Sequence, residues 1–381
     1  MKSLENLFLL CLFAAFSACN SSSVKNVTTI ALDDSEITVC DESEVKEKQE
    51  VKLSDLVEDF QIIQFENKEE AFFKSRWFFF SDNYICVRQD GKNVKMFDKS
   101  GKYIADVGEI GQGPGEYKVA YDVIIDEKGQ SIYISEIVSR AIMKYDMNGN
   151  FIRNIRLGGG KINKGRLFIQ PDETLSLAHL CFTDMDNVFT AANIQLNNND
   201  SAKYIYTDAL ASIFKDKENK NGGYNNEIWS YRNASGFPFM MTFTDTLYHY
   251  NSIDNKVKAV FTMKMDPEKK GDSFFIYNEF PHYYVVIIVG KNGKLILVDK
   301  NNQEAFEAKI VNDFMGNLDV HPSFQDGYYF KTYEPSVLKE KLKEQIASGK
   351  CPEEQIAKLT AFKETLNEND NNVLFLGKLK Q

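Results

Sequence analysis

The sequence predicts an all-β fold, a six-bladed β-propeller of four-stranded blades with a C-terminal helical hairpin insertion. Three observations predict it. A turn unit rich in Asp, Asn and Gly recurs at nearly even spacing along the chain. The runs between these turns are rich in aromatic and β-branched residues, as strands are. Helical periodicity is nearly absent before residue 335, so helices contribute little to the core.

The chain begins with an apolar run that is too short to span a membrane. Leu7–Phe16 has ten residues, and at about 1.5 Å per residue a helix of that length covers only half of a hydrocarbon core of about 30 Å. Its length suits the core of a signal peptide. Residues 1–18 are therefore predicted to be a signal peptide, and no second apolar run of spanning length follows.

The end of this segment, Phe16-Ser17-Ala18-Cys19, resembles a lipobox. The resemblance implies that Cys19 becomes the diacylated first residue of the mature chain, because two acyl chains are needed for stable anchoring. An ordinary cleaved signal peptide is the alternative. Residues 19–50 are mostly polar and are predicted to be a tether, with one strand at Glu36–Cys40. Since Asn20–Lys25 lacks an acidic run like that of surface-export tags, we expect an outer-membrane lipoprotein on the periplasmic side.

Residues 51–381 are predicted to form the propeller, because the turn unit recurs there with a period close to fifty residues. Its Asp or Asn stands at positions 98, 146, 197, 251 and 299, in steps of 48, 51, 54 and 48. Repeats of this length with about four strands are typical of propeller blades. A sixth blade is expected from Asp326–Tyr333, Val373–Leu376 and the first strand, Phe60–Phe65. Joining the two ends of the chain in one blade closes the ring and removes open strand edges. Seven blades are the alternative.

Two amphipathic segments near the C-terminus predict a helical hairpin at residues 334–368. Apolar residues recur there at helical spacing, and Gly349 and Pro352 lie between the two segments as a stop and a start. Packing against the propeller is favoured over docking of a partner as the role of this insertion.

The most distinctive segment is Gly108–Tyr117, which contains four glycines and a proline in eight residues. It is not a phosphate-binding loop, because no Lys-Ser/Thr pair follows and a strand, Asp122–Asp126, comes next instead of a helix. We interpret it as a structural turn between blades in which glycines adopt positive φ. The residues assigned to this turn motif are Gly111, Gly113, Pro114, Gly115, Glu116 and Tyr117.

From Gly108 to Ile152 the order of turns and strands resembles one NHL repeat, including Arg140 before the last strand. Residues 50–381 as a whole resemble the six-bladed β-propeller lipoproteins of Bacteroides-like bacteria. The resemblance implies this fold and an exported location. It implies no activity.

The net charge argues against one class of function, and the positions of the cysteines indicate their redox state. The net charge of −10 argues against nucleic-acid binding, which depends on neutralising phosphates. Beyond Cys11 and Cys19, four cysteines remain, which two disulfides could join in three ways. Because Cys86 and Cys181 stand in apolar runs, buried free thiols are favoured. The four are Cys40, Cys86, Cys181 and Cys351.

The sequence contains no local catalytic or metal-binding motif, so no catalytic residue is assigned. The four histidines, at 179, 249, 282 and 321, lie far apart, and no nucleophile elbow occurs. Propeller lactonases and amidating lyases hold a metal in the central channel with ligands scattered over several blades. Two functions therefore stay open. The favoured one is a monomeric, cofactor-free binding module for a protein or glycan; the other is a metal-dependent enzyme of the lactonase or lyase type with a metal ion in its channel.

Overall fold

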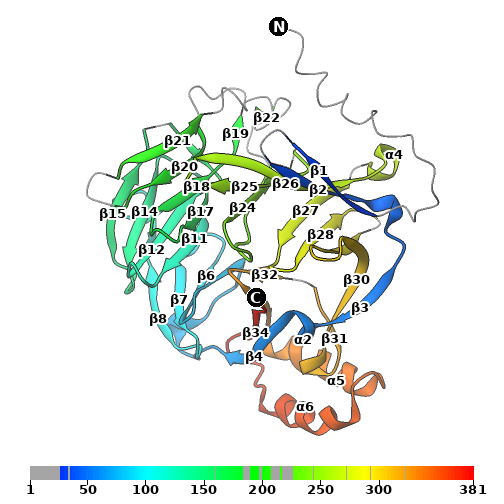
Figure 1. The fold of residues 1–381 in the computed structure, drawn as a ribbon. Coiled ribbons are helices and arrows are strands. Elements are labelled where there is room, and N and C mark those ends of the chain that lie inside the picture. The colour runs from blue at the N-terminus through cyan, green and yellow to red at the C-terminus, as the bar shows by residue number, and fades with distance from the viewer. Residues whose placement is uncertain are drawn as a thin grey trace, which may run out of the picture.

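The computed structural model describes residues 26–32, 35–158, 160–182, 189–196, 200–206, 215–216, 226–242, 244–271, 273–291, 293–321 and 323–381. In this part of the chain, six small sheets form a ring, so the fold is a six-bladed β-propeller, as predicted (Figure 1). The predicted signal peptide and Cys19 lie outside the described residues.

Blades 1 to 3 each contain four antiparallel strands in chain order. Blade 1 consists of β5 (Trp77–Phe80), β6 (Tyr84–Arg88), β7 (Val94–Asp98) and β8 (Tyr103–Val107). Blade 2 consists of β11 (Ala120–Asp126), β12 (Ser131–Glu136), β14 (Ala141–Asp146) and β15 (Phe151–Arg156). Blade 3 consists of β17 (Arg166–Ile169), β18 (Leu175–Ala178), β20 (Phe189–Ile194) and β21 (Ala202–Tyr206). The first strands of these three blades contact one another in chain order, β5 with β11 and β11 with β17.

Blades 4 and 5 repeat this order and carry additional outer strands. Blade 4 consists of β23 (Ile228–Trp229), β24 (Phe237–Met241), β25 (Thr246–Asn251) and β26 (Lys256–Lys264). Blade 5 consists of β27 (Phe274–Glu279), β28 (Tyr283–Val289), β29 (Lys294–Asp299) and β30 (Glu304–Asn312), and β31 (Leu318–Asp319) pairs with β30.

The N-terminal segment supplies the additional strands, which differs from the polar tether expected over residues 19–50. After β1 (Val27–Ala31), β2 (Glu36–Asp41) pairs in parallel with β26, and β3 (Lys48–Lys52) pairs in parallel with β30. Val27 and Cys40 are fully buried in the core between blades 4 and 5. The sequence concealed this role because polar and charged residues outnumber apolar ones over residues 19–50, and so the segment has the composition of a spacer.

Blade 6 joins the two ends of the chain, as predicted. It consists of β32 (Phe324–Gln325), β33 (Tyr328–Tyr333), β34 (Val373–Leu379) and β4 (Val57–Gln64). Strand β4 pairs with β34 from Gln64↔Val373 to Val57↔Leu379. Figure 1 shows the blue β4 beside the red β34, where the ring closes.

The predicted helical hairpin lies between the second and third strands of blade 6 and consists of α5 (Pro335–Ala347) and α6 (Glu353–Thr365). Leu338, Leu342 and Leu359 are buried in the same core cluster as Phe375 of β34, so the hairpin packs on this blade. The other helical elements are short: α2 (Leu53–Leu56), α4 (Pro267–Lys270), η1 (Glu42–Glu44), η2 (Glu69–Ala71) and η3 (Asp313–Met315).

The recurring Asp or Asn closes the turn between the third and fourth strands of its blade. The carboxylate of Asp98 accepts hydrogen bonds from the amides of Ser100 and Lys102, and Asp146 does the same for Asn148 and Asn150. Asn251 and Asp299 repeat this contact in blades 4 and 5. Such side chains are favoured in turns because they bind the backbone two residues ahead. Asn197 lies outside the described residues.

The core between the blades is aromatic, and the cysteines are part of it. The largest fully buried side chains are all tyrosines and phenylalanines. Cys40, Cys86, Cys181 and Cys351 are buried free thiols, as favoured from the sequence. Burial raises the pKa of Cys40 to about 12 and that of Cys86 also rises, which makes both thiols poor nucleophiles.

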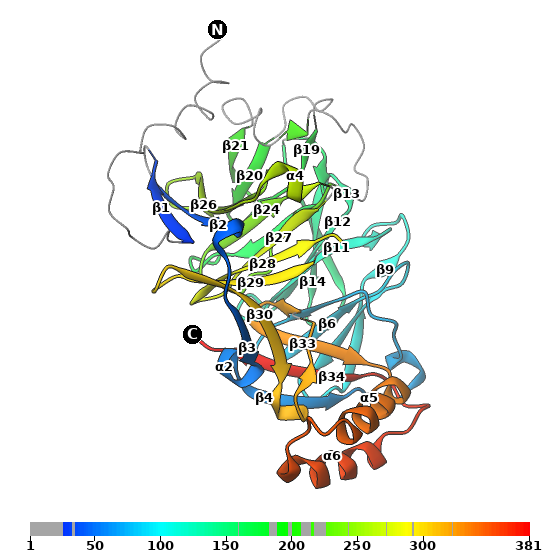
Figure 2. The same cartoon turned by 90° about the vertical axis from the view of Figure 1, so that its right-hand side faces the viewer.

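The ring has two faces that are built differently. The turn face carries the turns between first and second strands and between third and fourth strands. The connection face carries the links between blades and between second and third strands, including the hairpin. It also carries three short strand pairs: β9 (Glu109–Ile110) with β10 (Glu116–Tyr117), β13 (Val138–Ser139) with β16 (Ile162–Asn163), and β19 (Cys181–Phe182) with β22 (Lys215–Asp216). In Figure 2, β9 and α5 both project to the right.

Candidate functional site at the mouth of the channel

The central channel is filled by the segment between β23 and β24. We call this segment, residues 230–236, the plug loop. Ser230, Arg232 and Asn233 are buried in it, and Arg232 has a φ of +53°, which turns the chain sharply within the channel. The plug loop arises from blade 4, yet its contacts reach all the other blades.

Arg232 is the centre of these contacts. Its Nη1 donates to Asp122 Oδ2 of blade 2 at 2.8 Å, and its Nε donates to Asp326 Oδ1 of blade 6 at 2.5 Å. The remaining guanidinium donors bind the carbonyl oxygens of Leu167 and Val123, both at 3.1 Å. Although burial opposes the charge, the two carboxylates raise the pKa of Arg232 above its usual range. Arg232 is therefore a buried cation with its hydrogen bonds satisfied.

The residues beside Arg232 complete the contact with the ring. The Asn233 side chain donates to Asn278 Oδ1 of blade 5 at 3.0 Å and accepts the Gly327 amide of blade 6 at 2.8 Å. The ring of Tyr231 lies 6.2 Å from that of Trp77 in blade 1. One loop thus ties six sheets together, and it seals the channel.

A second group of charged residues occupies the connection-face end of the channel. Glu227 accepts hydrogen bonds from the Tyr121 hydroxyl and from Lys164 Nζ, both at 2.6 Å. Arg166 stacks over the Tyr121 ring at 4.3 Å and donates to the carbonyl oxygen of Ile228. These side chains pair with one another and so stabilise the links between blades 2, 3 and 4.

This arrangement bears on the metal-dependent alternative. The carboxylates that converge on the channel axis, Asp122 and Asp326, are both bound by Arg232. Among the described residues, no group of three or more His, Cys, Asp or Glu side chains could hold a metal ion. The position expected for a channel metal is occupied by a guanidinium.

The histidines do not converge either. His179 is fully buried, with Nδ1 3.0 Å from the carbonyl oxygen of Leu180, and burial lowers its pKa to about 4. His249 Nε2 lies 2.5 Å from Glu279 Oε2, and Lys300 binds the other oxygen of Glu279 at 2.7 Å. His282 and His321 are exposed. The four histidines therefore lie in separate environments and do not form one site.

Above the plug loop, on the turn face, lies a cavity of about 390 Å³. We call it the mouth cavity. Phe80, Ile124 and Phe168 contribute apolar wall, while Arg232 and Asp326 belong to the sealed channel beneath. Its other lining residues are Ser81, Asp82, Ile125, Asp126, Glu127, Lys128, Ile169 and Tyr328. Its volume falls in the lower part of the range of about 300–1,000 Å³ that is typical of ligand sites.

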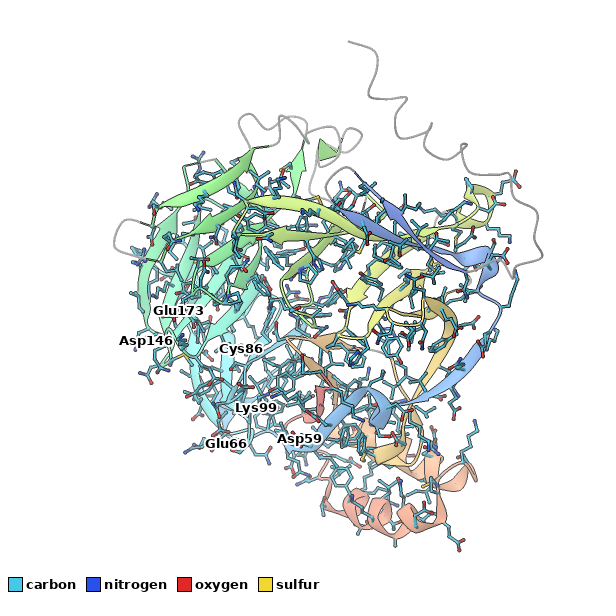
Figure 3. The ribbon with its side chains drawn as sticks, viewed as in Figure 1. Asp59, Glu66, Cys86, Lys99, Asp146 and Glu173 are labelled. Carbon is cyan, nitrogen blue, oxygen red and sulfur yellow. The ribbon has the colours of Figure 1, made fainter. Side chains whose placement is uncertain are left out.

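Lys99 lies at the edge of this cavity, in the turn between β7 and β8. Its Nζ is 3.6 Å from the centre of the Tyr328 ring and 5.4 Å from that of Phe80, and it finds no hydrogen-bond acceptor among the described residues. Burial lowers the pKa of Lys99 to about 8. Figure 3 shows Lys99 at the lower edge of blade 1, below Cys86. The rings of Tyr328 and Phe80 thus cover a buried ammonium group.

The Gly-rich segment lies far from this cavity, on the connection face between β8 and β11. The Tyr117 hydroxyl donates to the carbonyl oxygen of Val107 and accepts the amide of Val94. Glu116 Oε2 accepts the amide of Gly113 at 2.8 Å, and a Cβ at Gly111 would lie only 1.9 Å from that oxygen. Gly115 has a φ of +78° and lies against the Phe151 ring, just after Pro114. The contacts of this motif are all within blades 1 and 2.

Reasoning from the sequence missed the plug loop and the mouth cavity. The segment Ser230-Tyr231-Arg232-Asn233 carries no motif, and its partners Asp122 and Asp326 are about 110 and 94 positions away. The sequence shows Asp122 and Asp326 only as acidic residues in or beside apolar strands. A single sequence does not distinguish such residues from acidic residues on the surface.

Residues 35–378 match the model of a family described as a domain of unknown function, DUF4934. The chain belongs to this family.

A solved structure with a TM-score above 0.5 shows the same fold. A Bacteroides fragilis protein described as exported gives a TM-score of 0.62 at 17% identity, covering 90% of this chain and 100% of that chain. A DUF4221 family member from Bacteroides vulgatus gives a TM-score of 0.44 at 14% identity, over 85% of this chain and 97% of that chain. A comparison with curated proteins gives no match. Within the described residues, no helix is both long enough and apolar enough to cross a membrane.

Proposed function

We propose that this protein is a non-catalytic binding module and that its ligand occupies the mouth cavity. The observation that carries the proposal is a cavity of about 390 Å³ above a channel whose buried charges are already paired. A ligand can therefore enter from the turn face but cannot pass through the ring. Because Asp122 and Asp326 are bound by Arg232, the groups left to interact with a ligand are those of the cavity wall.

The chemistry of that wall favours a neutral, hydroxyl-rich ligand such as an oligosaccharide. Sugar hydroxyls can donate to the carboxylates of Asp82 and Asp126, which line the cavity. The apolar face of a sugar ring can pack against Phe80 or Tyr328, and such mixed walls fix both position and orientation. The alternative ligand is a protein segment. It would enter the same cavity and present hydroxyl groups of its own.

The test compares two aspartates of nearly equal exposure. Asp82 lines the cavity and its side chain is 79% exposed, whereas Asp90 lies away from the cavity and is 77% exposed. A glycan array identifies an oligosaccharide, and titration calorimetry measures its affinity. We expect Asp82→Ala to weaken binding about tenfold, the loss of one hydrogen bond to a charged group, and Asp90→Ala to leave it unchanged. The absence of any glycan signal, or equal effects of the two variants, contradicts the proposal.

A metal analysis distinguishes the proposal from the lactonase- or lyase-type alternative. We expect the purified protein to hold no stoichiometric metal after dialysis, because the channel carboxylates are paired with Arg232. A tightly held metal ion at one per chain would contradict a purely binding role.

We further propose that the protein is exported and anchored through Cys19 to the periplasmic side of the outer membrane. The lipobox-like sequence supports this location, and so does the similarity to a Bacteroides fragilis protein described as exported. Labelling with a fatty acid in cells should depend on Cys19. A Cys19→Ser variant that still takes up label would refute the anchor.

A further inference from the structure

The exposed apolar side chains of this propeller are unevenly distributed between its faces. Of the ten large apolar residues that are exposed in the described part of the chain, one, Ile253, lies in a turn of the turn face. Three, Ile30, Leu32 and Ile152, lie in or beside outer strands. The remaining six lie on the connection face: Phe72, Ile110, Val119, Ile137, Val138 and Val337.

Four of these six form one group over blades 1 and 2, which we call the connection patch: Ile110, Val119, Ile137 and Val138. Their exposed fractions are 39%, 38%, 37% and 53%. The amide of Ile137 donates to the carbonyl oxygen of Val119, which places the two loops side by side. Strand pairs β9–β10 and β13–β16 fix the backbone beneath them. The patch is thus a set of ordered loop tips.

Four exposed basic residues surround the connection patch: Lys118, Arg140, Arg156 and Lys161. Ser139 pairs with Ile162 in an antiparallel register, so Arg140 and Lys161 are neighbours, and Arg156 pairs with Ala141. In the described part of the chain, none of the four takes part in an ion pair with an acidic side chain.

Three acidic residues nearby offset part of this charge. Glu109 is exposed, but Glu116 and Glu136 are half-buried, and each accepts a backbone amide, from Gly113 and Lys118 respectively. With four basic and three acidic side chains, the rim keeps a small positive charge on a chain whose net charge is −10.

We propose that the connection patch inserts its apolar tips into the surface of an anionic lipid bilayer. Exposed aliphatic residues flanked by lysine and arginine suit the boundary between headgroups and acyl chains, where each basic residue adds attraction to anionic lipid. A protein partner is the less favoured occupant, because protein interfaces are enriched in aromatic residues and this patch is aliphatic. Two cavities of the described residues, about 390 Å³ on the turn face and about 210 Å³ beside the hairpin, lie away from the connection patch. This placement would leave the mouth cavity facing away from the membrane, whatever its ligand.

The test measures binding of residues 26–381 to sedimenting lipid vesicles. These residues contain all six blades but exclude the apolar run Leu7–Phe16, which would itself bind lipid. Vesicles of phosphatidylcholine alone are compared with an equimolar mixture of phosphatidylcholine and phosphatidylglycerol. We expect binding to the mixed vesicles only, and its loss at high salt, because exposed charges are screened there.

Three variants make the test specific. Ile137→Asp with Val138→Asp should abolish sedimentation with the mixed vesicles, and Arg140→Gln with Lys161→Gln should weaken it about twentyfold, since each basic residue contributes about fivefold. Ile253→Asp is the matched control: it changes a side chain that is 88% exposed, but on the turn face, and should have no effect. Far-UV circular dichroism checks that each variant is folded. If the mixed vesicles fail to bind the unaltered chain, or if Ile253→Asp weakens binding as much as the patch variants, the proposal is wrong, and an acidic protein becomes the occupant to test.

Discussion

Arg232 shows how a single residue can connect its own blade to four others of this ring. Its guanidinium contacts carboxylates or carbonyl oxygens from blades 2, 3 and 6 and stacks 5.7 Å from the Phe79 ring of blade 1. A buried ion pair of this kind does not by itself imply high stability, because desolvation offsets much of the attraction. Removing one partner is different, since the other charges then stay buried without compensation.

We therefore expect Arg232→Met to reduce the free energy of unfolding by about 3–5 kcal/mol, because Asp326 loses its counter-ion and Asp122 loses the nearer of its two, retaining Arg166 at 3.4 Å. Denaturant titration measures this change. Arg76→Met is the control: Arg76 is 61% exposed and lies 3.9 Å from Asp90, so its loss should cost less than about 1 kcal/mol. Adding Asp122→Asn and Asp326→Asn to Arg232→Met should restore part of the stability. Equal effects of the Arg232 and Arg76 variants would show that the channel charges are not coupled.

His179 makes the stability depend on pH. Burial lowers the pKa of its imidazole from 6.5 to about 4, so between these values the unfolded chain binds a proton that the folded chain does not. The contribution of His179 to the free energy of unfolding is therefore fully present above pH 6.5, and it is lost as the pH drops towards 4. The total change is about 3 kcal/mol, at 1.36 kcal/mol for each pKa unit.

Denaturant titrations across this pH window provide the measurement. His179→Gln should flatten the acid side of the stability profile, whereas His282→Gln, at an exposed position, should retain its slope. A His179→Gln profile that is as steep as that of the unaltered chain would assign the acid sensitivity to other groups.

At the scale of elements, the recurring turns of blades 1 and 2 fasten each of these blades to the one before it. The amide of Gly108, after β8, donates to the carbonyl oxygen of Gly149 in the blade 2 turn. The amide of Glu66, after β4, donates in the same way to Gly101 in the blade 1 turn. Gly101 and Gly149 have φ values of +88° and +81°, and an added Cβ would lie 2.6 Å from Gln64 O and 2.0 Å from Asp106 O, respectively. Only glycine satisfies both the dihedral angle and the close approach.

This contact gives a prediction with an internal control. Gly149→Ala should reduce the free energy of unfolding by about 3 kcal/mol, because it combines a left-handed conformation with a collision against the neighbouring backbone. Gly91 has a φ of +63° but no atom within 4 Å of an added Cβ, so Gly91→Ala should cost only about 1 kcal/mol. Thermal unfolding of both variants measures the difference. Equal losses would mean that the turns do not fasten the blades.

The elements also show what local sequence can and cannot predict. The turns at Asp98, Asp146, Asn251 and Asp299 were predictable, because the side chain that closes each turn is itself the sequence signal. Strands β2 and β3 were missed as additions to blades 4 and 5. Their pairing partners, β26 and β30, are more than two hundred residues away, and no local rule selects a partner at that distance.

For the whole molecule, stability depends on closure of the ring by β4 and β34. Pairing of the ends was expected because an unclosed propeller leaves a sheet edge open, and such edges favour aggregation. The structure adds that this closing blade also carries the hairpin, whose Leu338, Leu342 and Leu359 bury against it.

Two truncations test the importance of closure. Deleting residues 1–65 removes β4 and leaves β34 with an open edge, so we expect aggregation and loss of cooperative unfolding. Deleting residues 1–45 removes only β1 and β2, and this chain should stay soluble with reduced stability. Light scattering and calorimetry distinguish the outcomes. A soluble, cooperatively unfolding chain without residues 1–65 would refute the role of closure.

The sequence by itself determined the architecture of this protein: an all-β ring, its turn positions, its closing blade and its helical insertion. These depend on local turn chemistry and on strand periodicity, which every blade repeats. Only the tertiary structure decided what lies at the centre. Arg232 meets Asp122 and Asp326 because six sheets converge on one axis, and the cavity above them exists only where turns from separate blades come together.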